Sequence, residues 1–218
     1  MTTRAAPLVL AATSGTGKTT IAHRLVGDDP RYVFSISATT RPPREGERDG
    51  VDYHFLSTEE FERRIGRGDF AEWARVHDRL YGTPRSEVDD AAARGEHVVL
   101  DIDVQGARQI RESVSDAHLV FVLPPSVGIM MARLTGRGTE ERADIARRLR
   151  SALLELQAVP EFDYVVVNDD LDECLDEIRA IVEEGAAPEP PEQDAESFRG
   201  EIRRILEAEY DEIEQDNE

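Results

Sequence analysis

The segment SGTGKT, residues 14–19, constrains the fold of this chain more than any other. It follows a short apolar run, Leu8–Ala12, and precedes a helix-like segment, Thr19–Val26. Glycines let backbone N–H groups converge on phosphate oxygens, and the N-terminus of the next helix adds partial positive charge. We therefore predict a phosphate-binding loop between a strand and a helix. The usual pattern begins with glycine where this chain has Ala12, and an unusual backbone dihedral there would cost about 1–3 kcal/mol.

Lys18 is the only lysine in the chain, beside 25 arginines. We expect Lys18 to reach the β and γ phosphates of a nucleotide and the Thr19 hydroxyl to help hold Mg²⁺. The alternative is a glycine-rich turn that happens to contain a lysine. The near absence of lysine has two explanations, an arginine-favouring GC-rich genome or an acidic, lysine-poor surface adapted to high salt. We favour the second, a halophilic protein.

The charge and the apolar runs exclude several classes of protein. With 46 acidic against 26 basic residues the formal net charge is −20, and nucleic-acid binding needs a basic surface instead. No apolar run approaches the roughly 18 residues needed to span a bilayer, and the start lacks the long apolar stretch of a signal peptide. A single cysteine, Cys174, suggests a reducing compartment. We expect a cytoplasmic protein with no membrane or nucleic-acid partner.

Strand-like and helix-like segments alternate along most of the chain. The runs are apolar throughout rather than alternately polar, which indicates strands buried on both faces of a parallel sheet. Strands separated by helices predict a doubly wound α/β fold. The predicted strands are Leu8–Ala12, Tyr32–Ser37, His97–Val104, His118–Leu123 and Tyr164–Val167, and the predicted helices are Thr19–Val26, Thr58–Ile65 with Ser57 as its cap, a helix from Pro84 to near Gly95, Ser126–Leu134, Glu141–Ala158 and Leu171–Glu184.

Three regions depart from this alternation. Residues 38–84 are rich in Gly, Arg, Asp and aromatic residues, and we predict an inserted subdomain there, inside a main domain of residues 1–184. Residues 126–150 form an arginine-rich segment whose glycines Gly136 and Gly138 provide hinges. Residues 185–218 begin with a linker, GAAPEPP, and continue as an acidic amphipathic helix with Ser197 as the expected cap. The sequence leaves open whether the protein is a monomer or a homodimer.

A second group of residues suggests a site for a second phosphate group. Arg41 and Arg44 lie in a proline-stiffened loop, and guanidinium groups match phosphate oxygens in pairs. Glu72 stands beside Trp73, and LDIDVQG, residues 100–106, ends a predicted strand with two carboxylates. We expect strand alternation to place Asp101 and Asp103 on one face.

Several motifs in order resemble the guanylate kinases, a family of P-loop nucleoside monophosphate kinases. The resemblance covers residues 7–184 and rests on SATTRPPREGERDGVDYHFLS, EWA, LYGTPR, LDIDVQGA, the GRGT lid segment and VVNDDLDE. It implies transfer of the γ-phosphoryl group of ATP to GMP, and to dGMP, giving ADP and GDP with Mg²⁺. It also implies an inserted subdomain that binds GMP and a lid that closes over ATP.

The resemblance assigns roles to individual residues. It implies that GMP is bound by Ser37, Arg41, Arg44, Tyr53, Glu72, Tyr81, Thr83 and Asp103. It implies that ATP is bound by Ser14, Gly15, Thr16, Gly17, Lys18, Thr19, Thr20, Arg133, Arg137 and Asn168. The catalytic residues would be Lys18, Arg41, Arg137 and Arg148, with Thr19 and Asp101 at Mg²⁺, the latter through its outer shell. Thr83, where relatives may carry serine, would keep a hydroxyl for the guanine carbonyl.

Two other functions remain open at this point. One is a non-catalytic guanylate-kinase-like module that binds a phosphorylated partner; such modules are expected to lose the phosphate loop, whereas Lys18 and Thr19 are present. The other is a phosphoryl transferase acting on a different acceptor, against which Glu72 and Asp103 argue because both suit guanine.

Overall fold

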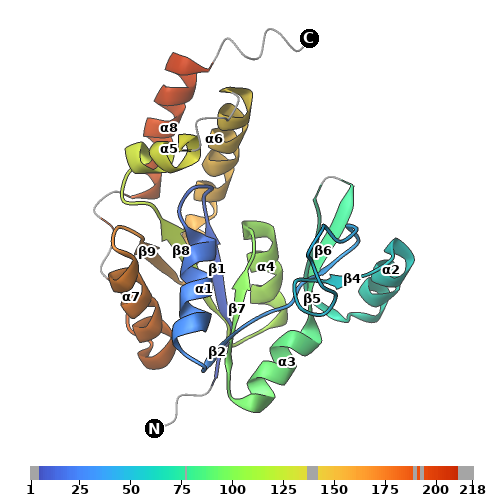
Figure 1. Ribbon diagram of the computed structural model, residues 1–218. Coiled ribbons are helices and arrows are strands. Elements are labelled where there is room, and N and C mark those ends of the chain that lie inside the picture. Colours follow the sequence, from blue (N-terminus) through green and yellow to red (C-terminus); the bar gives the residue numbers. More distant parts are fainter. Residues whose placement is uncertain (1–4, 77, 137–141, 189–190, 192–193, 211–218) are drawn as a thin grey trace. The chain divides into compact units, whose positions relative to one another are not determined.

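The computed structural model describes residues 5–76, 78–136, 142–188, 191 and 194–210 and contains two sheets (Figure 1). The five-stranded sheet has the order β2-β7-β1-β8-β9, and its strand pairs β1–β7, β2–β7 and β8–β9 are parallel. Its strands are β1 (Leu8–Ala12), β2 (Tyr32–Phe34), β7 (His97–Asp101), β8 (His118–Leu123) and β9 (Tyr164–Val167). Strands β1, β7 and β8 are buried almost throughout and β2 and β9 in part, which confirms the predicted α/β fold with a parallel sheet.

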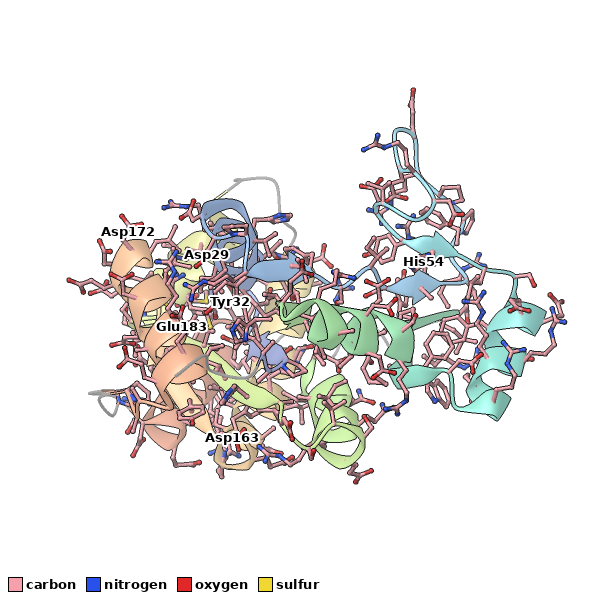
Figure 2. The ribbon with its side chains drawn as sticks, turned by 90° about the horizontal axis from the view of Figure 1, so that it is seen from below. Asp29, Tyr32, His54, Asp163, Asp172 and Glu183 are labelled. Carbon is pink, nitrogen blue, oxygen red and sulfur yellow. The ribbon has the colours of Figure 1, made fainter. Side chains whose placement is uncertain are left out.

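Two compact units make up the chain, one from the N-terminus to Leu10 with Ala22–Leu119, the other from Ala11–Ile21 with Val120 to the C-terminus. In the first unit Tyr32, labelled in Figure 2, is buried and stacks on His97 with ring centroids 5.1 Å apart. The same unit holds α3 (Arg85–Arg94) and α4 (Val104–Ser113).

The predicted insertion forms a sheet of its own within the first unit. Its strand order is β4-β3-β6-β5, from β3 (Ala38–Thr39), β4 (His54–Phe55), β5 (Phe70–Val76) and β6 (Arg79–Pro84). Helix α2 (Thr58–Arg67) packs Phe61 against Phe70, with ring centroids 4.3 Å apart. Ser57 caps α2 as predicted, because its hydroxyl accepts a hydrogen bond from the backbone N–H of Glu60 at 3.2 Å.

Helices dominate the second unit. They are α5 (Val127–Thr135), α6 (Arg142–Gln157), α7 (Leu171–Glu184) and α8 (Ala195–Glu209), with a short 3-10 turn at Val159–Glu161, and α1 (Lys18–Asp28) begins here. Cys174 is one of the buried residues of α7, and burial raises the pKa of its thiol to about 12. Helix α8 packs along α6 and α5, burying Phe198 and Ile202 (Figure 1).

The structure corrects two local predictions. Strand β7 ends at Asp101 rather than Val104, and the helix α4 that follows was missed because Gly106 and its polar neighbours hide the apolar period. Ser197 does not cap α8; the carboxylate of Asp194 accepts the backbone N–H of Ser197 at 2.7 Å, which places Ser197 inside the first turn. None of the helices in the described part of the chain has both the length and the apolar character needed to cross a bilayer.

Candidate active site

The predicted phosphate loop links β1 to α1 in the second unit. Gly15 and Gly17 have φ of 85° and 93°, a backbone region that favours glycine. A Cβ on Gly17 would also lie 2.8 Å from Nδ2 of Asn168. Ala12 is the last residue of β1, where the backbone is extended, so the position that usually holds glycine needs no unusual dihedral here.

Two predicted ATP-binding residues hold the carbonyl of the loop residue Thr16. The side-chain amide of Asn168 donates to it at 2.7 Å and Nη1 of Arg133 donates to it at 3.1 Å. Nη2 of Arg133 also donates to the carbonyl of Asn168, at 3.4 Å. Asn168 and Thr16 are both buried. These hydrogen bonds hold the backbone of the loop in its shape. The sequence did not indicate this role for Arg133 and Asn168.

Residues 12–20 line a cavity of about 350 Å³, with one contribution from outside the loop. Lys18 and Thr19 open α1 and line it with Ser14, Gly15, Thr16, Gly17 and Thr20, so all seven predicted loop residues meet at this cavity. The outside residue is Glu155 of α6, which the sequence analysis missed. Its distance of more than 130 residues from the loop left no local signal.

The predicted lid is only partly covered by the described residues. Arg137, Gly138 and Thr139 lie outside them. Arg148 lies on α6 and is not among the residues that line the loop cavity. Arg147 of the same helix is exposed and pairs with Asp144 at 2.7 Å, as expected of a surface residue.

A second cavity, of about 180 Å³, lies in the first unit and gathers most of the predicted GMP-binding residues. Ser37, Tyr53, Glu72, Tyr81 and Asp103 line it, together with Asp101. They come from β5, β6, the end of β7 and two loops, which are distant in sequence. Arg41, Arg44 and Thr83 are not among the lining residues.

Glu72 is the buried acid of this cavity. Its side chain accepts a hydrogen bond from the Thr83 hydroxyl at 2.7 Å, across the β5–β6 pair. Burial raises the pKa of Glu72, the hydrogen bonds from Thr83 oppose that shift, and the charge of Asp103 adds to it. A Cβ on Gly106 would lie 3.0 Å from Oε2 of Glu72, so the absence of a side chain there leaves room for this carboxylate.

The hydroxyl of Thr83 therefore has a different hydrogen-bond partner from the one expected. The sequence suggested a hydroxyl for the guanine carbonyl, but the single O–H proton is donated to Glu72, and Thr83 is fully buried beneath it. A hydroxyl has only one proton to donate, so here it serves the acid rather than the cavity.

Asp103 reaches the cavity by a route other than strand alternation. It is the N-cap of α4, and its Oδ1 accepts the backbone N–H groups of Gln105 and Gly106, both at 2.9 Å. Because β7 ends at Asp101, the expectation that alternation sets both carboxylates is wrong, although both line the cavity.

Arg41 lies next to the cavity through its aromatic neighbours. Its guanidinium carbon is 5.3 Å from the ring centre of Tyr53 and 5.8 Å from that of Phe55. Tyr53 in turn stands edge-on to Tyr81, with centroids 6.3 Å apart. The guanidinium also pairs with Glu47 at 2.8 Å.

The oxygen groups of both cavities are of the kind that Mg²⁺ prefers. Thr19 offers a hydroxyl beside the loop, and Asp101 offers a carboxylate at the end of β7. Among the described residues, no group of three or more His, Cys, Asp or Glu side chains is arranged to hold a metal. Mg²⁺ is commonly bound by one or two protein groups plus substrate phosphates, so each of these groups, taken by itself, is of a kind that suits an ion arriving with a nucleotide.

Comparison with known proteins identifies the family. A family model described as guanylate kinase matches residues 4–185. A guanylate kinase of Nitratidesulfovibrio vulgaris is 51% identical over 183 residues, covering 84% of this chain and 88% of its own length. One from Thermotoga maritima is 44% identical over 196 residues, covering 89% and 95%. The crystal structure of guanylate kinase from Anaplasma phagocytophilum superposes with a TM-score of 0.65 at 31% identity, covering 95% of this chain and 96% of that one. With the phosphate loop and the acidic cavity both in place, the chain belongs to the guanylate kinase family.

Proposed function

We propose that the protein transfers the γ-phosphoryl group of ATP to GMP, and to dGMP, giving ADP and GDP. The observation that carries this proposal is the pair of acids, Glu72 and Asp103, in the cavity of the first unit. Guanine presents N1–H and an exocyclic amine as donors, which suit carboxylate acceptors. Adenine has no N1–H, so it would leave a buried acceptor unpaired, and such a loss supports discrimination by several orders of magnitude.

We propose that the phosphate of GMP, the acceptor, is bound by arginine side chains and by hydroxyl groups. Arg41 and Arg44 provide guanidinium forks that match phosphate oxygens. Ser37, Tyr53 and Tyr81 provide hydroxyl donors, and all three line the same cavity as Glu72. Thr83 acts on GMP through Glu72, whose carboxylate it orients.

The donor nucleotide is the proposed ligand of the phosphate loop. Backbone N–H groups of residues 14–20 and the ammonium of Lys18 hold the phosphates, and Lys18 contacts the β and γ groups. Arg133 and Asn168 keep the loop in shape through Thr16. We propose that Arg137 and Arg148 act on the transferring group when the lid region, residues 126–150, closes over ATP.

Mg²⁺ is the proposed metal: the Thr19 hydroxyl would help hold it with ATP, and the Asp101 carboxylate would hold it from the outer shell. When bound, it neutralises charge on the phosphates. The chain's own residues do the rest: Lys18 and the loop fix the donor, and Arg41 and Arg44 fix the acceptor.

Positioning and charge stabilisation account for the proposed catalysis. The nucleophile is a GMP phosphate oxygen that is already anionic, so no general base is needed to activate it. The obstacle is the approach of two polyanions in line, which cationic side chains relieve. This supports the assignment of Lys18, Arg41, Arg137 and Arg148 as catalytic residues.

We extend the proposal to the organisation and setting of the protein. Residues 1–184 would form the kinase domain, with residues 38–84 binding GMP, and residues 185–218 would form an acidic linker and helix. Cytoplasmic purine nucleotide metabolism is the proposed setting, in a cell with high internal salt, as the net charge of −20 suggests. We propose ATP and GMP as the partners, with no nucleic acid and no membrane, for a monomer or homodimer.

A panel of nucleoside monophosphates tests the function. With ATP and Mg²⁺ we expect rapid ADP formation with GMP and dGMP and little with AMP, CMP or UMP. Lys18→Ala should stay folded and lose several orders of magnitude in kcat, because its charge acts on the transferring group. A non-catalytic module would instead bind GMP without releasing ADP, and that result would refute the enzyme.

A further inference from the structure

Glu47 makes the most direct contact with Arg41 that the described structure records. Its Oε1 accepts a hydrogen bond from Nη2 of Arg41 at 2.8 Å and its Oε2 accepts one from Nη1 at 2.9 Å. The side chains are only 15% and 20% exposed. This paired geometry is the strongest form of an arginine–carboxylate contact.

The remaining donors of Arg41 form a second fork. A guanidinium has five N–H groups, and Glu47 and the carbonyl of Pro42, which accepts from Nη1 at 2.8 Å, take three of them. The Nε–H and the second Nη2–H lie side by side on the other edge, and the guanidinium also has a hydrogen bond with Tyr81, a residue that lines the cavity. That edge has the spacing of two phosphate oxygens.

Glu47 also fixes the backbone next to the second arginine. Its Oε2 accepts the backbone N–H of Arg44 at 2.6 Å, and its own N–H donates to the carbonyl of Arg44 at 3.1 Å. These two bonds close the turn between residues 44 and 47. One carboxylate therefore constrains both Arg41 and the loop that carries Arg44.

The charge on Glu47 persists under working conditions. Its hydrogen bond from Arg41 comes first and that from the Arg44 backbone second in lowering its pKa to about 2. The same contact raises the pKa of Arg41. The pair is thus doubly ionised at any pH at which the enzyme is assayed.

We propose that Glu47 is a positioning residue for the GMP phosphate, because it grips Arg41 by one fork and leaves the other fork set for the phosphate. The inference rests on the proposed role of Arg41. The competing interpretation is a counter-ion that occupies Arg41 and must be displaced by GMP. The two differ in sign: a positioning residue raises GMP affinity, whereas a competing counter-ion lowers it.

The Glu47→Gln variant tests whether Glu47 raises or lowers the affinity for GMP. Its amide replaces one acceptor oxygen by an NH₂ group that opposes an N–H donor, so the fork cannot re-form. We expect KM for GMP to rise about tenfold or more, KM for ATP to change less than twofold, and GMP affinity by calorimetry to fall in parallel. Glu45→Gln is the matched control, because it removes the same charge from an exposed neighbour and should leave both KM values unchanged.

A double-mutant cycle separates positioning from a merely structural effect. In an Arg41→Ala background, Glu47→Gln should change KM for GMP much less than in the wild type, because only its contribution through the Arg44 loop remains. An equal rise in both backgrounds would show that Glu47 acts only on the loop and would overturn the proposal, as would an unchanged or lower KM in the wild-type background. An Arg41→Ala variant with normal GMP affinity would instead refute the proposed role of Arg41. Melting temperatures check that each variant is folded. Glu47→Ala is a second variant, and we expect it too to raise KM for GMP while leaving KM for ATP nearly unchanged.

Discussion

The contact between Thr83 and Glu72 gives a prediction with a worked magnitude. Thr83→Val removes the hydroxyl and keeps the shape of the side chain, leaving a buried carboxylate with one donor fewer. A hydrogen bond to a charged group contributes about 1.5–3 kcal/mol. At 1.36 kcal/mol per unit, its loss should raise the pKa of Glu72 by about 1–2 units.

This change acts on stability and on binding with opposite pH dependence. Burial already raises the pKa of Glu72, so the folded protein binds more protons than the unfolded chain, and the group's contribution to stability falls as the pH rises through the folded-state pKa. Thr83→Val should therefore cost more stability at pH 8 than at pH 5. GMP binding needs ionised Glu72, so the affinity for GMP should fall as the pH drops, with a midpoint about 1–2 units higher than in the wild type.

The assay is KM for GMP and urea unfolding across pH 5–9, with Thr83→Ser as the matched control that retains the hydroxyl. We expect KM for GMP in Thr83→Val to rise about tenfold near neutral pH and to recover partly at high pH. Thr83→Ser should keep the wild-type midpoint, with only a small loss of stability from the missing methyl group. If both variants share the wild-type midpoint and KM, the hydroxyl does not set the charge of Glu72 and the argument fails.

Three further predictions address other parts of the molecule. Asn168→Asp replaces the amide that donates to the Thr16 carbonyl by an acceptor, so KM for ATP should rise about tenfold while KM for GMP stays within twofold; an unchanged KM for ATP would show that the loop holds its shape without this bond. Phe198→Ala should destabilise the protein by about 3 kcal/mol in thermal or urea unfolding, because Phe198 is buried where α8 packs on α6. The control, Glu207→Ala on the exposed side of α8, should cost less than about 0.5 kcal/mol, and equal effects of the two variants would contradict this packing. Activity and melting temperature should both rise with KCl from dilute buffer toward molar concentration, because salt screens repulsion among the excess acids, and a flat or falling profile would favour codon usage as the origin of the arginine excess.

Local patterns were sufficient for the framework of the fold. The glycines and the lysine of residues 14–19 placed the phosphate loop, and the structure has β8, β9 and α7 within the residues predicted for them. The burial of Cys174 followed from its place on an apolar helix face. Apolar period, caps and turn residues act between neighbours in sequence, so they can be read without the rest of the chain. Ser37, Tyr53 and Glu72, which belong to separate motifs of the family resemblance, line one cavity, and their binding of GMP stays a prediction.

The partners of the polar side chains were decided only by the tertiary structure. Asn168 donates a hydrogen bond to the carbonyl of Thr16, 152 residues away in the sequence. The Thr83 hydroxyl donates a hydrogen bond to Glu72 on the neighbouring strand. Asp103 caps a helix that the sequence pattern concealed, and α8 covers α6. A carboxylate, amide or hydroxyl bonds with whichever complementary group the fold brings within about 3 Å, and no local period encodes that meeting. The sequence of this protein specified which chemical groups are present and on which elements they stand, and the packing of those elements specified what each group holds.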